Sequence, residues 1–486
     1  LQTWIGPFSV CETGPIGFVL KPSPGSSMRL SLLLSLFFLS SGVLQPAGAQ
    51  EPAPDPGPPN QERGPDRPEL KALQEQIKSL QTEIDRLRSE MNSAASPPSP
   101  RSAPAPGRAA AGGGSMNPKI SLDGLFSAAG SSAPDLQNIE TGGHDPNQRG
   151  FTVQNVEVAL SASVDPYFTG NANIVYQLDR NGESFVELEE AYLTSTSLPW
   201  NLQVKGGQFF SPFGRLNPTH PHAWDFADQP LVNGRFLGPD GLRGPGVQIS
   251  YLLPVPIYLE AIVAIQNGSG ETGFSFRNRP DEVLFGRTLI DRPVAHVTDL
   301  LIIPRLVGSV DVTETQTAVV GISGAFGPNG SGADTRTAIV GADVYYKWKP
   351  LRAESGWPFV GWQTEMMARR YEAGPGGGLS IPENPPIPEE VLRDRGGYTQ
   401  LLYGFKRPWV AGLRLDYVAG SGGDPALDPL RARRFRLSPN VTYYPSEFSK
   451  LRLQYNRDDI QSRDQIVHSL FLQWEFLIGE HGAHKF

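Results

Sequence analysis

The histidines of this chain are the first residues whose type and spacing could support chemistry. His220 and His222 are two residues apart, and His481 and His484 form a second close pair near the end of the sequence. Neutral imidazole is a common zinc ligand. Each pair alone supplies fewer ligands than a zinc site needs, and the topology expected below places the pairs on opposite sides of a membrane. We therefore predict no metal site and no cofactor, and keep the four histidines as weak candidates.

Charged residues of both signs surround the first histidine pair, between positions 211 and 245. Opposed acidic and basic side chains in a narrow passage select solutes by charge and size. We interpret seven residues as candidates for lining such a constriction: Arg215, His220, His222, Asp225, Asp228, Arg235 and Arg243. Trp224, Phe226 and Phe236 would pack this segment on a wall. An ordinary set of solvent-facing loop charges is the alternative.

Catalytic motifs give no support for an enzyme. The chain has no G-x-S-x-G elbow, no H-E-x-x-H pair and no Walker loop. His296 and His468 remain as spare histidines, but the sequence assigns no serine partner to either. We predict that the protein is not an enzyme.

The segment that must position these residues runs from Met116 to Phe486 and alternates with a period of two. Leu451, Leu453 and Tyr455, for example, alternate with Arg452, Gln454 and Asn456. Such strands have one apolar and one polar face. About sixteen strands are expected, starting near Lys119, Phe151, Phe168, Ser184, Trp200, Gly246, Ile257, Leu300, Thr315, Thr335, Trp357, Gly397, Trp409, Arg434, Ser449 and Gln465.

The spacing between the strands indicates the fold class. Short turns, such as Asp165-Pro166 and Arg407-Pro408, alternate with long connections at 129–150, 211–245, 268–299 and 372–396. This is the pattern of an outer-membrane barrel, with short periplasmic turns and long outer loops. We predict an all-β, transmembrane antiparallel β-barrel of about 16 strands, in which 211–245 is the third outer loop. A soluble β-sandwich is the alternative, but it would need internal domain boundaries that 116–486 lacks.

In such a barrel the polar face lines the lumen. Six charged residues are expected on the lumen wall: Glu157, Lys205, Glu365, Arg414, Asp416 and Arg452. The strong alternation over Ser469–Ile478 marks a last strand, and Phe486 is the candidate signal for the barrel-assembly machinery.

The residues before the barrel divide into five segments. Met28, Arg29, an apolar run and Ala47-Gly48-Ala49 predict a signal peptide over 28–49, and we interpret 1–27 as a mis-called upstream extension. Proline-rich 50–69 is expected to be a linker, and 93–115 a disordered linker. Seven apolar residues between them repeat in steps of three and four and predict a coiled coil over 70–92, in the periplasm: Leu70, Leu73, Ile77, Leu80, Ile84, Leu87 and Met91. A solitary surface helix is the alternative.

Composition excludes other classes of protein. The formal charge of -8 argues against nucleic acid as a partner. The lone Cys11 precedes the leader, so the mature chain would carry no cysteine, as suits an oxidising envelope.

Three stretches resemble a known family. These are the start Met116-Asn117-Pro118-Lys119-Ile120-Ser121-Leu122-Asp123-Gly124, then Gly206-Gly207-Gln208-Phe209-Phe210-Ser211-Pro212-Phe213-Gly214-Arg215-Leu216-Asn217, and the following His220-Pro221-His222-Ala223-Trp224-Asp225-Phe226. They are similar to an uncharacterised proteobacterial branch of porin-like proteins within the phosphate-selective porin O/P superfamily. The resemblance implies a sixteen-stranded homotrimer in the outer membrane of a Gram-negative bacterium.

Together these features favour an outer-membrane porin that lets small hydrophilic solutes or ions diffuse through a water-filled pore narrowed by the third outer loop. The expected partners are outer-membrane lipid, further copies of the chain and the assembly machinery. Two alternatives stay open. One is a plugged, structural or binding barrel, with metal-related uptake as one role, anchored by its coiled coil; the other is an envelope enzyme.

Overall fold

The computed structural model describes residues 118–178, 182–353, 356–376, 386–423 and 428–479. The predicted signal peptide, linkers and coiled coil lie outside these residues, as do His481, His484 and Phe486. Within the described part, no helix is both long enough and apolar enough to cross a membrane.

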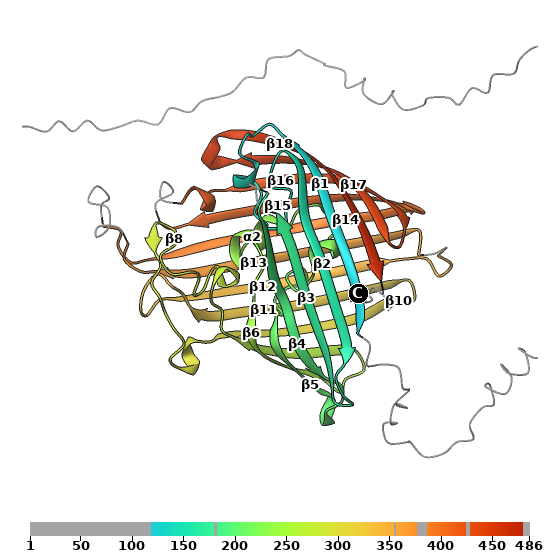
Figure 1. Ribbon diagram of the computed structural model, residues 1–486, viewed down its shortest axis with the longest axis horizontal. Helices are drawn as coiled ribbons and strands as arrows, with labels where there is room; N and C mark the ends of the chain where they lie inside the picture. Colours follow the sequence, from blue (N-terminus) through green and yellow to red (C-terminus); the bar gives the residue numbers. More distant parts are fainter. Residues whose placement is uncertain (1–117, 179–181, 354–355, 377–385, 424–427, 480–486) are drawn as a thin grey trace, which may run out of the picture. The chain divides into compact units, whose positions relative to one another are not determined.

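Sixteen antiparallel strands close into one barrel (Figure 1). The strands of the first half are β1 (Lys119–Ser131), β2 (Gly150–Ser163), β3 (Phe168–Leu178), β4 (Ser184–Ser195), β5 (Leu202–Phe210), β6 (Arg243–Leu252), β7 (Tyr258–Gln266) and β10 (Leu301–Thr313). Those of the second half are β11 (Gln316–Pro328), β12 (Arg336–Trp348), β13 (Phe359–Ala373), β14 (Glu390–Lys406), β15 (Trp409–Ser421), β16 (Arg434–Ser446), β17 (Ser449–Ile460) and β18 (Gln465–Gly479). Pairing of β1 with β18 closes the ring.

The predicted strand order and count are confirmed. Fifteen of the sixteen expected starts lie within three residues of the observed ones. The exception is the strand expected near Gly397, which begins at Glu390. The first residues of this strand include charged Arg393, Asp394 and Arg395. Because these residues do not alternate with apolar ones, the hydrophobic pattern predicted a strand that starts too late.

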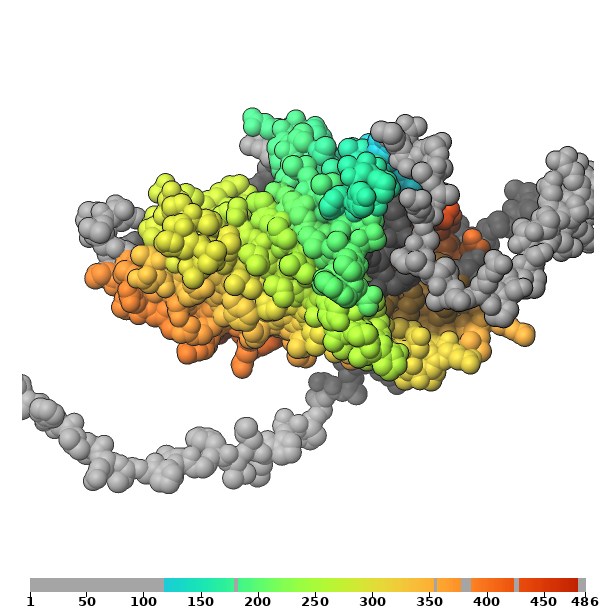
Figure 2. Space-filling model, turned by 90° about the horizontal axis from the view of Figure 1, so that it is seen from below, coloured from blue at the N-terminus to red at the C-terminus, as the bar shows by residue number. Residues whose placement is uncertain are grey.

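Alternation along each strand separates an outer apolar face from an inner polar face. On β15, Leu413 and Leu415 are exposed on the outside, whereas Arg414 and Asp416, which alternate with them, are buried inside. Figure 2 shows part of the outer wall, where neighbouring strands form a continuous surface. A closed ring satisfies every strand edge, which leaves the wall without an unpaired edge strand.

Short connections gather on one rim and long ones on the other, as expected. The longest are 132–149, 211–242 and 267–300. The last of these contains β8 (Val283–Leu284) and β9 (Arg287–Thr288), which form a separate two-stranded sheet.

The largest apolar core lies inside the barrel. It joins the 211–242 connection, including the short helix α2 (Leu231–Leu237), to wall residues such as Ile303, Ile339 and Val418. Six of the seven residues of α2 are buried, and the helix contacts β13, β14 and β15 (Figure 1). Gly238 ends α2 with a φ of 106°, a conformation that glycine adopts without steric cost.

Candidate functional site

The 211–242 connection folds into the lumen because of the turn that follows β5. Gly214 has a φ of 64°, and a Cβ at this position would stand 2.2 Å from Oε2 of Glu365 on β13. The same carboxylate accepts hydrogen bonds from the backbone amides of Arg215 (3.1 Å) and Leu216 (2.8 Å). Phe213 beside the turn is fully buried. Glycine is therefore required where the chain bends across the barrel.

Beyond this turn the connection is tied to strands around much of the ring. On β15 to β17, Leu231 N donates to Asp416 (3.1 Å), Asn440 donates to the carbonyl of Asp225 (2.9 Å), and Ala227 N donates to Gln454 (2.8 Å). On the other side, His220 and His222 contact Glu157 of β2 and Glu189 of β4. The connection thus crosses the lumen.

Asp228 is the main anchor of the crossing. Its Oδ1 accepts hydrogen bonds from Arg414 (2.9 Å) and Gln454, and its Oδ2 accepts from Asn456 (2.9 Å) and Arg436. Burial raises the pKa of this carboxyl, but the guanidinium groups of Arg414 and Arg436 outweigh burial and lower the pKa to about 2. Asp228 is therefore ionised at neutral pH.

The first outer connection also enters the lumen. Glu140 forms two hydrogen bonds with Arg436, at 2.7 and 2.9 Å, and Arg436 also bonds Asp458 on β17. Asp145 accepts hydrogen bonds from the amides of Gln229 and Gly142. Sequence reasoning did not assign these residues, since their contacts join positions far apart in the chain. In the sequence, the length of the polar connection 129–150 was the feature that could have pointed to them.

A second charged cluster surrounds His220. Its Nδ1 lies 2.8 Å from Oε2 of Glu189 and 3.3 Å from Oε2 of Glu157, and its Nε2 lies 3.0 Å from Oε2 of Glu190. Nδ1 of His222 lies 3.1 Å from the same Oε2 of Glu157, and the two imidazoles stack with centroids 5.7 Å apart. Burial lowers the pKa of His220, but Glu157 and Glu189 outweigh it and hold that pKa well above its usual value.

A bulge in β4 explains why Glu190 was missed. Strict alternation would place Glu189 and Glu190 on opposite faces. The pairing of β3 with β4 shifts by one residue between Asn173 and Ile174, so both carboxylates reach His220. The phase of an alternating pattern does not reveal such an extra residue.

The remaining residues predicted for the constriction are dispersed over the lumen. Arg215 stacks on the ring of Tyr345, at 3.9 Å from the centroid. Asp225 accepts a hydrogen bond from Gln400 (3.0 Å), and Arg235 donates to the carbonyl of Ala432 (2.9 Å). Arg243 is the first residue of β6, not a loop residue, and bonds Glu189 (3.0 Å) and Glu187.

The residues predicted for the lumen wall do not form a single cluster. Glu365 accepts from the amides of Arg215 and Leu216, and Glu157 contacts His220 and His222, so both bind the first part of the crossing connection. Arg414 bonds both Asp416 (2.8 Å) and Asp228 (2.9 Å), and Arg452 donates to the carbonyl of Trp224 (2.8 Å). The ammonium group of Lys205 lies over the ring of Tyr192, at 4.4 Å.

The interior is crowded at the level of the crossing. Arg243, Arg369, Arg414, Arg436 and Arg452 are among the largest side chains that are almost completely buried. Each bonds acidic or polar groups of the wall or of an inward connection. The interior charges are therefore mostly paired and not displayed to open water.

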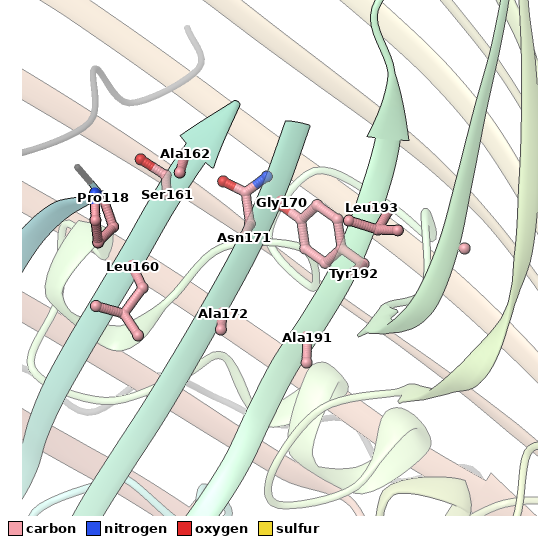
Figure 3. A pocket seen from close by; sticks show the side chains of 11 residues that line it. Pro118, Leu160, Ser161, Ala162, Gly170, Asn171, Ala172, Ala191, Tyr192 and Leu193 are labelled. Carbon is pink, nitrogen blue, oxygen red and sulfur yellow. The ribbon is translucent and has the colours of Figure 1, made fainter. Parts of the chain in front are cut away.

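A cavity of about 380 Å³ lies on the wall between β2 and β5 (Figure 3). Its lining includes Leu160, Ala172, Ala191 and Leu193 but no charged residue. This cavity is therefore separate from the charged side chains of the crossing connection.

These features define the class of the protein as a closed sixteen-stranded β-barrel with an apolar exterior and a charged interior. The 211–242 connection, the third on the long-loop rim, folds into that interior. The chain belongs to the same family as an uncharacterized protein of Aquifex aeolicus (strain VF5). That protein is 32% identical over 405 residues, which cover 76% of this chain and 80% of the relative. No family model matches the sequence.

Solved structures with a similar fold include the following three, each of low sequence identity. The channel DcaP of Acinetobacter baumannii has a TM-score of 0.49 at 12% identity and aligns with 74% of this chain and 96% of its own. OprB of Pseudomonas putida has a TM-score of 0.45 at 12% identity, with 74% and 94% covered. An anion-selective porin from Comamonas acidovorans has a TM-score of 0.44 at 7% identity, with 74% and 100% covered.

Proposed function

We propose that this protein is an outer-membrane channel of the porin type, through which small hydrophilic solutes or ions diffuse passively. The observation that carries the proposal is the 211–242 connection, which crosses a charged lumen inside an apolar wall. Mixed charges along such a passage select solutes by size and charge. The constriction would be lined by Arg215, His220, His222, Asp225, Asp228 and Arg235, with Arg243 on the adjoining wall.

The apolar exterior supports placement in a membrane. Exposed leucine, valine, isoleucine and aromatic side chains cover the outer face of the strands, including Leu413, Leu453 and Ile322. Only closed barrels and helices satisfy their backbone hydrogen bonds within lipid. The predicted signal peptide over 28–49 would deliver the chain to the envelope, and the predicted coiled coil over 70–92 would then lie in the periplasm.

Assembly is also part of the proposal. The resemblance of Gly206–Gly214 to the phosphate-selective porin O/P superfamily supports a homotrimer. Phe486 would present the chain to the barrel-assembly machinery. The interior does not favour anions, because acidic residues such as Glu157, Glu189 and Asp228 lie among its arginines.

One observation favours a second candidate, a sealed barrel. The large interior arginines are nearly all buried and paired, so the crossing connection leaves little free charge to face a passing solute. A barrel filled in this way would serve as a structural or binding module of the envelope.

Single-channel recording from the refolded protein in a planar bilayer separates the two candidates. We expect small conductance steps, in groups of three if the channel is a trimer. Reversal potential in a salt gradient would then give the ion preference. A heat-modifiable, β-rich and inserted sample that conducts no current would contradict the channel and support the sealed barrel.

A further inference from the structure

The cluster around His220 gathers three buried carboxylates in one corner of the lumen. Glu157, Glu189 and Glu190 contact the stacked imidazoles of His220 and His222. The guanidinium of Arg243 bonds Glu189 and, on the wall beside it, Glu187. Buried carboxylates are stable when they are paired with cations or coordinate metals, so a metal ion that takes the place of the Nδ1 proton of His220 would keep these carboxylates compensated.

The ligand atoms of the cluster already converge. One ligand atom each from Glu157, Glu189 and His220 lie within 4.8 Å of one another. Zinc is bound by imidazole nitrogen and carboxylate oxygen at about 2.0–2.2 Å. Two ligands of one ion therefore stand about 3–4 Å apart. Nδ1 of His220 lies 3.3 Å from Oε2 of Glu157, within that range, and 2.8 Å from Oε2 of Glu189, a hydrogen bond that would lengthen slightly around an ion. His222 stands beside the group, in contact with the same oxygen of Glu157.

Glu157 and Glu189 each bond an outer partner through one oxygen and turn the other oxygen toward His220. Oε1 of Glu157 accepts from Asn173, and Oε1 of Glu189 accepts from Arg243, so that Oε2 of each faces His220. Nε2 of His220 meets Glu190, whose other oxygen accepts from the amide of Phe210 (3.0 Å). A histidine that ligates a metal through one nitrogen usually donates its other N–H to a carboxylate, which fixes ring and tautomer.

His144 supplies an independent observation on the same cluster. This side chain is 3% exposed, and its Nε2 has no hydrogen-bond partner among the described residues. That nitrogen lies 3.7 Å from Oε1 of Glu189 and 3.9 Å from Oδ1 of Asp240. An unsatisfied buried nitrogen aimed at the carboxylates indicates that a further polar group belongs there. Water held by a bound ion would satisfy it.

We propose that His220, Glu157 and Glu189 bind one divalent transition-metal ion of the zinc class inside the lumen, with His222 adjacent as a further ligand. Imidazole favours such ions over magnesium and calcium, which take oxygen ligands. From the sequence we predicted no metal site, because each histidine pair was considered without carboxylate ligands. The carboxylates that complete the set come from β2 and β4. The site holds its ion whether or not the lumen conducts.

Titration of zinc into the full-length, refolded and chelator-stripped protein tests the proposal. By isothermal calorimetry we expect one Zn²⁺ per chain and no comparable binding of Mg²⁺. Co²⁺ in place of Zn²⁺ should give visible absorption bands of a nitrogen- and oxygen-ligated site. Failure of the wild-type protein to bind Zn²⁺ would overturn the proposal.

Matched variants locate the binding. His220→Gln removes a ligand and should abolish one-to-one binding, whereas His468→Gln, which changes an exposed histidine bonded to Tyr455, should leave it intact. The double variant His481→Gln, His484→Gln should also bind normally. Retention of binding in His220→Gln, or its loss in the double variant, would place the ion elsewhere and refute the assignment.

Glu190→Gln covers the case in which His220→Gln does not fold. This change leaves all ligand atoms in place and removes only the carboxylate behind His220. Changes to such outer partners lower metal affinity by about 10–100-fold. An unchanged affinity in Glu190→Gln, in a sample with wild-type heat-modifiable migration, would contradict a site built on His220.

Discussion

At the scale of the residue, Asp228 shows how one side chain can fix a long connection in place. Its two carboxylate oxygens meet Arg414, Arg436, Gln454 and Asn456, which come from three neighbouring strands. Removal of one partner of a buried ion pair leaves the other charge without compensation. Asp228 is therefore the residue at which the crossing is most vulnerable.

Asp228→Asn should destabilise the protein by about 3–5 kcal/mol, because Arg414 and Arg436 would lose a shared buried anion. Urea unfolding in lipid vesicles measures the free energy. The matched control is Asp459→Asn, since Asp459 pairs at 3.8 Å with Arg433 on the surface and both side chains are largely exposed. A small effect at Asp228, similar to that at Asp459, would show that the crossing is held by other contacts.

The difference in stability between the wild-type protein and Asp228→Asn should depend on pH, because the pKa of Asp228 is lowered. Arg414 and Arg436 hold the pKa at about 2 against burial, whereas an unfolded aspartate titrates near about 3.9. The stabilising contribution is thus fully present above about pH 4 and is lost as the pH falls toward 2. Wild-type protein and Asp228→Asn should differ in unfolding temperature at pH 5–8 and converge at the acid end. A difference that vanished already at pH 6 would contradict the assigned pKa.

At the scale of the element, helix α2 controls how tightly the crossing connection fills the lumen. Phe236 is fully buried, and the guanidinium of Arg369 lies 4.9 Å from its ring centroid. Apolar contacts with β13 to β15 hold the helix on one side of the barrel. In the channel proposed above, a loosened helix would widen the passage.

Phe236→Ala should weaken this packing, at a cost of about 3–5 kcal/mol for a buried phenylalanine, and raise the single-channel conductance. Phe405→Ala is the matched control, because Phe405 is exposed on the outer face of β14 and should leave the conductance unchanged. Equal conductance in both variants would show that α2 does not border the conducting path.

Elements were predicted more accurately from the sequence than were contacts. The alternation of Leu413, Leu415 and Tyr417 with Arg414 and Asp416 gave both the strand and its inner face. The location of 211–242 on the long-loop rim followed from the order of the strands. The same reasoning could not find Glu190, which a bulge turns inward, or Glu140, which meets Arg436 across the barrel. Contacts between residues so far apart in the chain do not appear in a periodic pattern of the sequence.

At the scale of the whole molecule, the outer face distinguishes a membrane barrel from a soluble one. Its exposed apolar side chains form a band around the strands, and Leu415 is the middle residue of β15 (Trp409–Ser421). Ser421 ends the same strand at the long-loop rim. Leu415 thus lies at the centre of the wall that is proposed to contact lipid, and Ser421 lies at its edge.

Leu415→Arg should destabilise the barrel in vesicles by about 2–4 kcal/mol, and Ser421→Arg by about 0–1 kcal/mol, because the cost of arginine on a lipid-facing wall depends on depth. Reversible unfolding of both variants in the same vesicles gives the comparison. Equal costs at the two positions would contradict a wall that faces lipid at its centre.

The closure of β1 on β18 also sets an order of events in time. The anchors of the crossing, Arg414, Arg436, Gln454 and Asn456, all lie in the last three strands before β18. The connection made early in the chain must therefore wait for partners made about 200 residues later. Contacts between such distant positions form slowly. The four contacts that hold Asp228 can therefore form only after β15, β16 and β17 have taken their places in the wall.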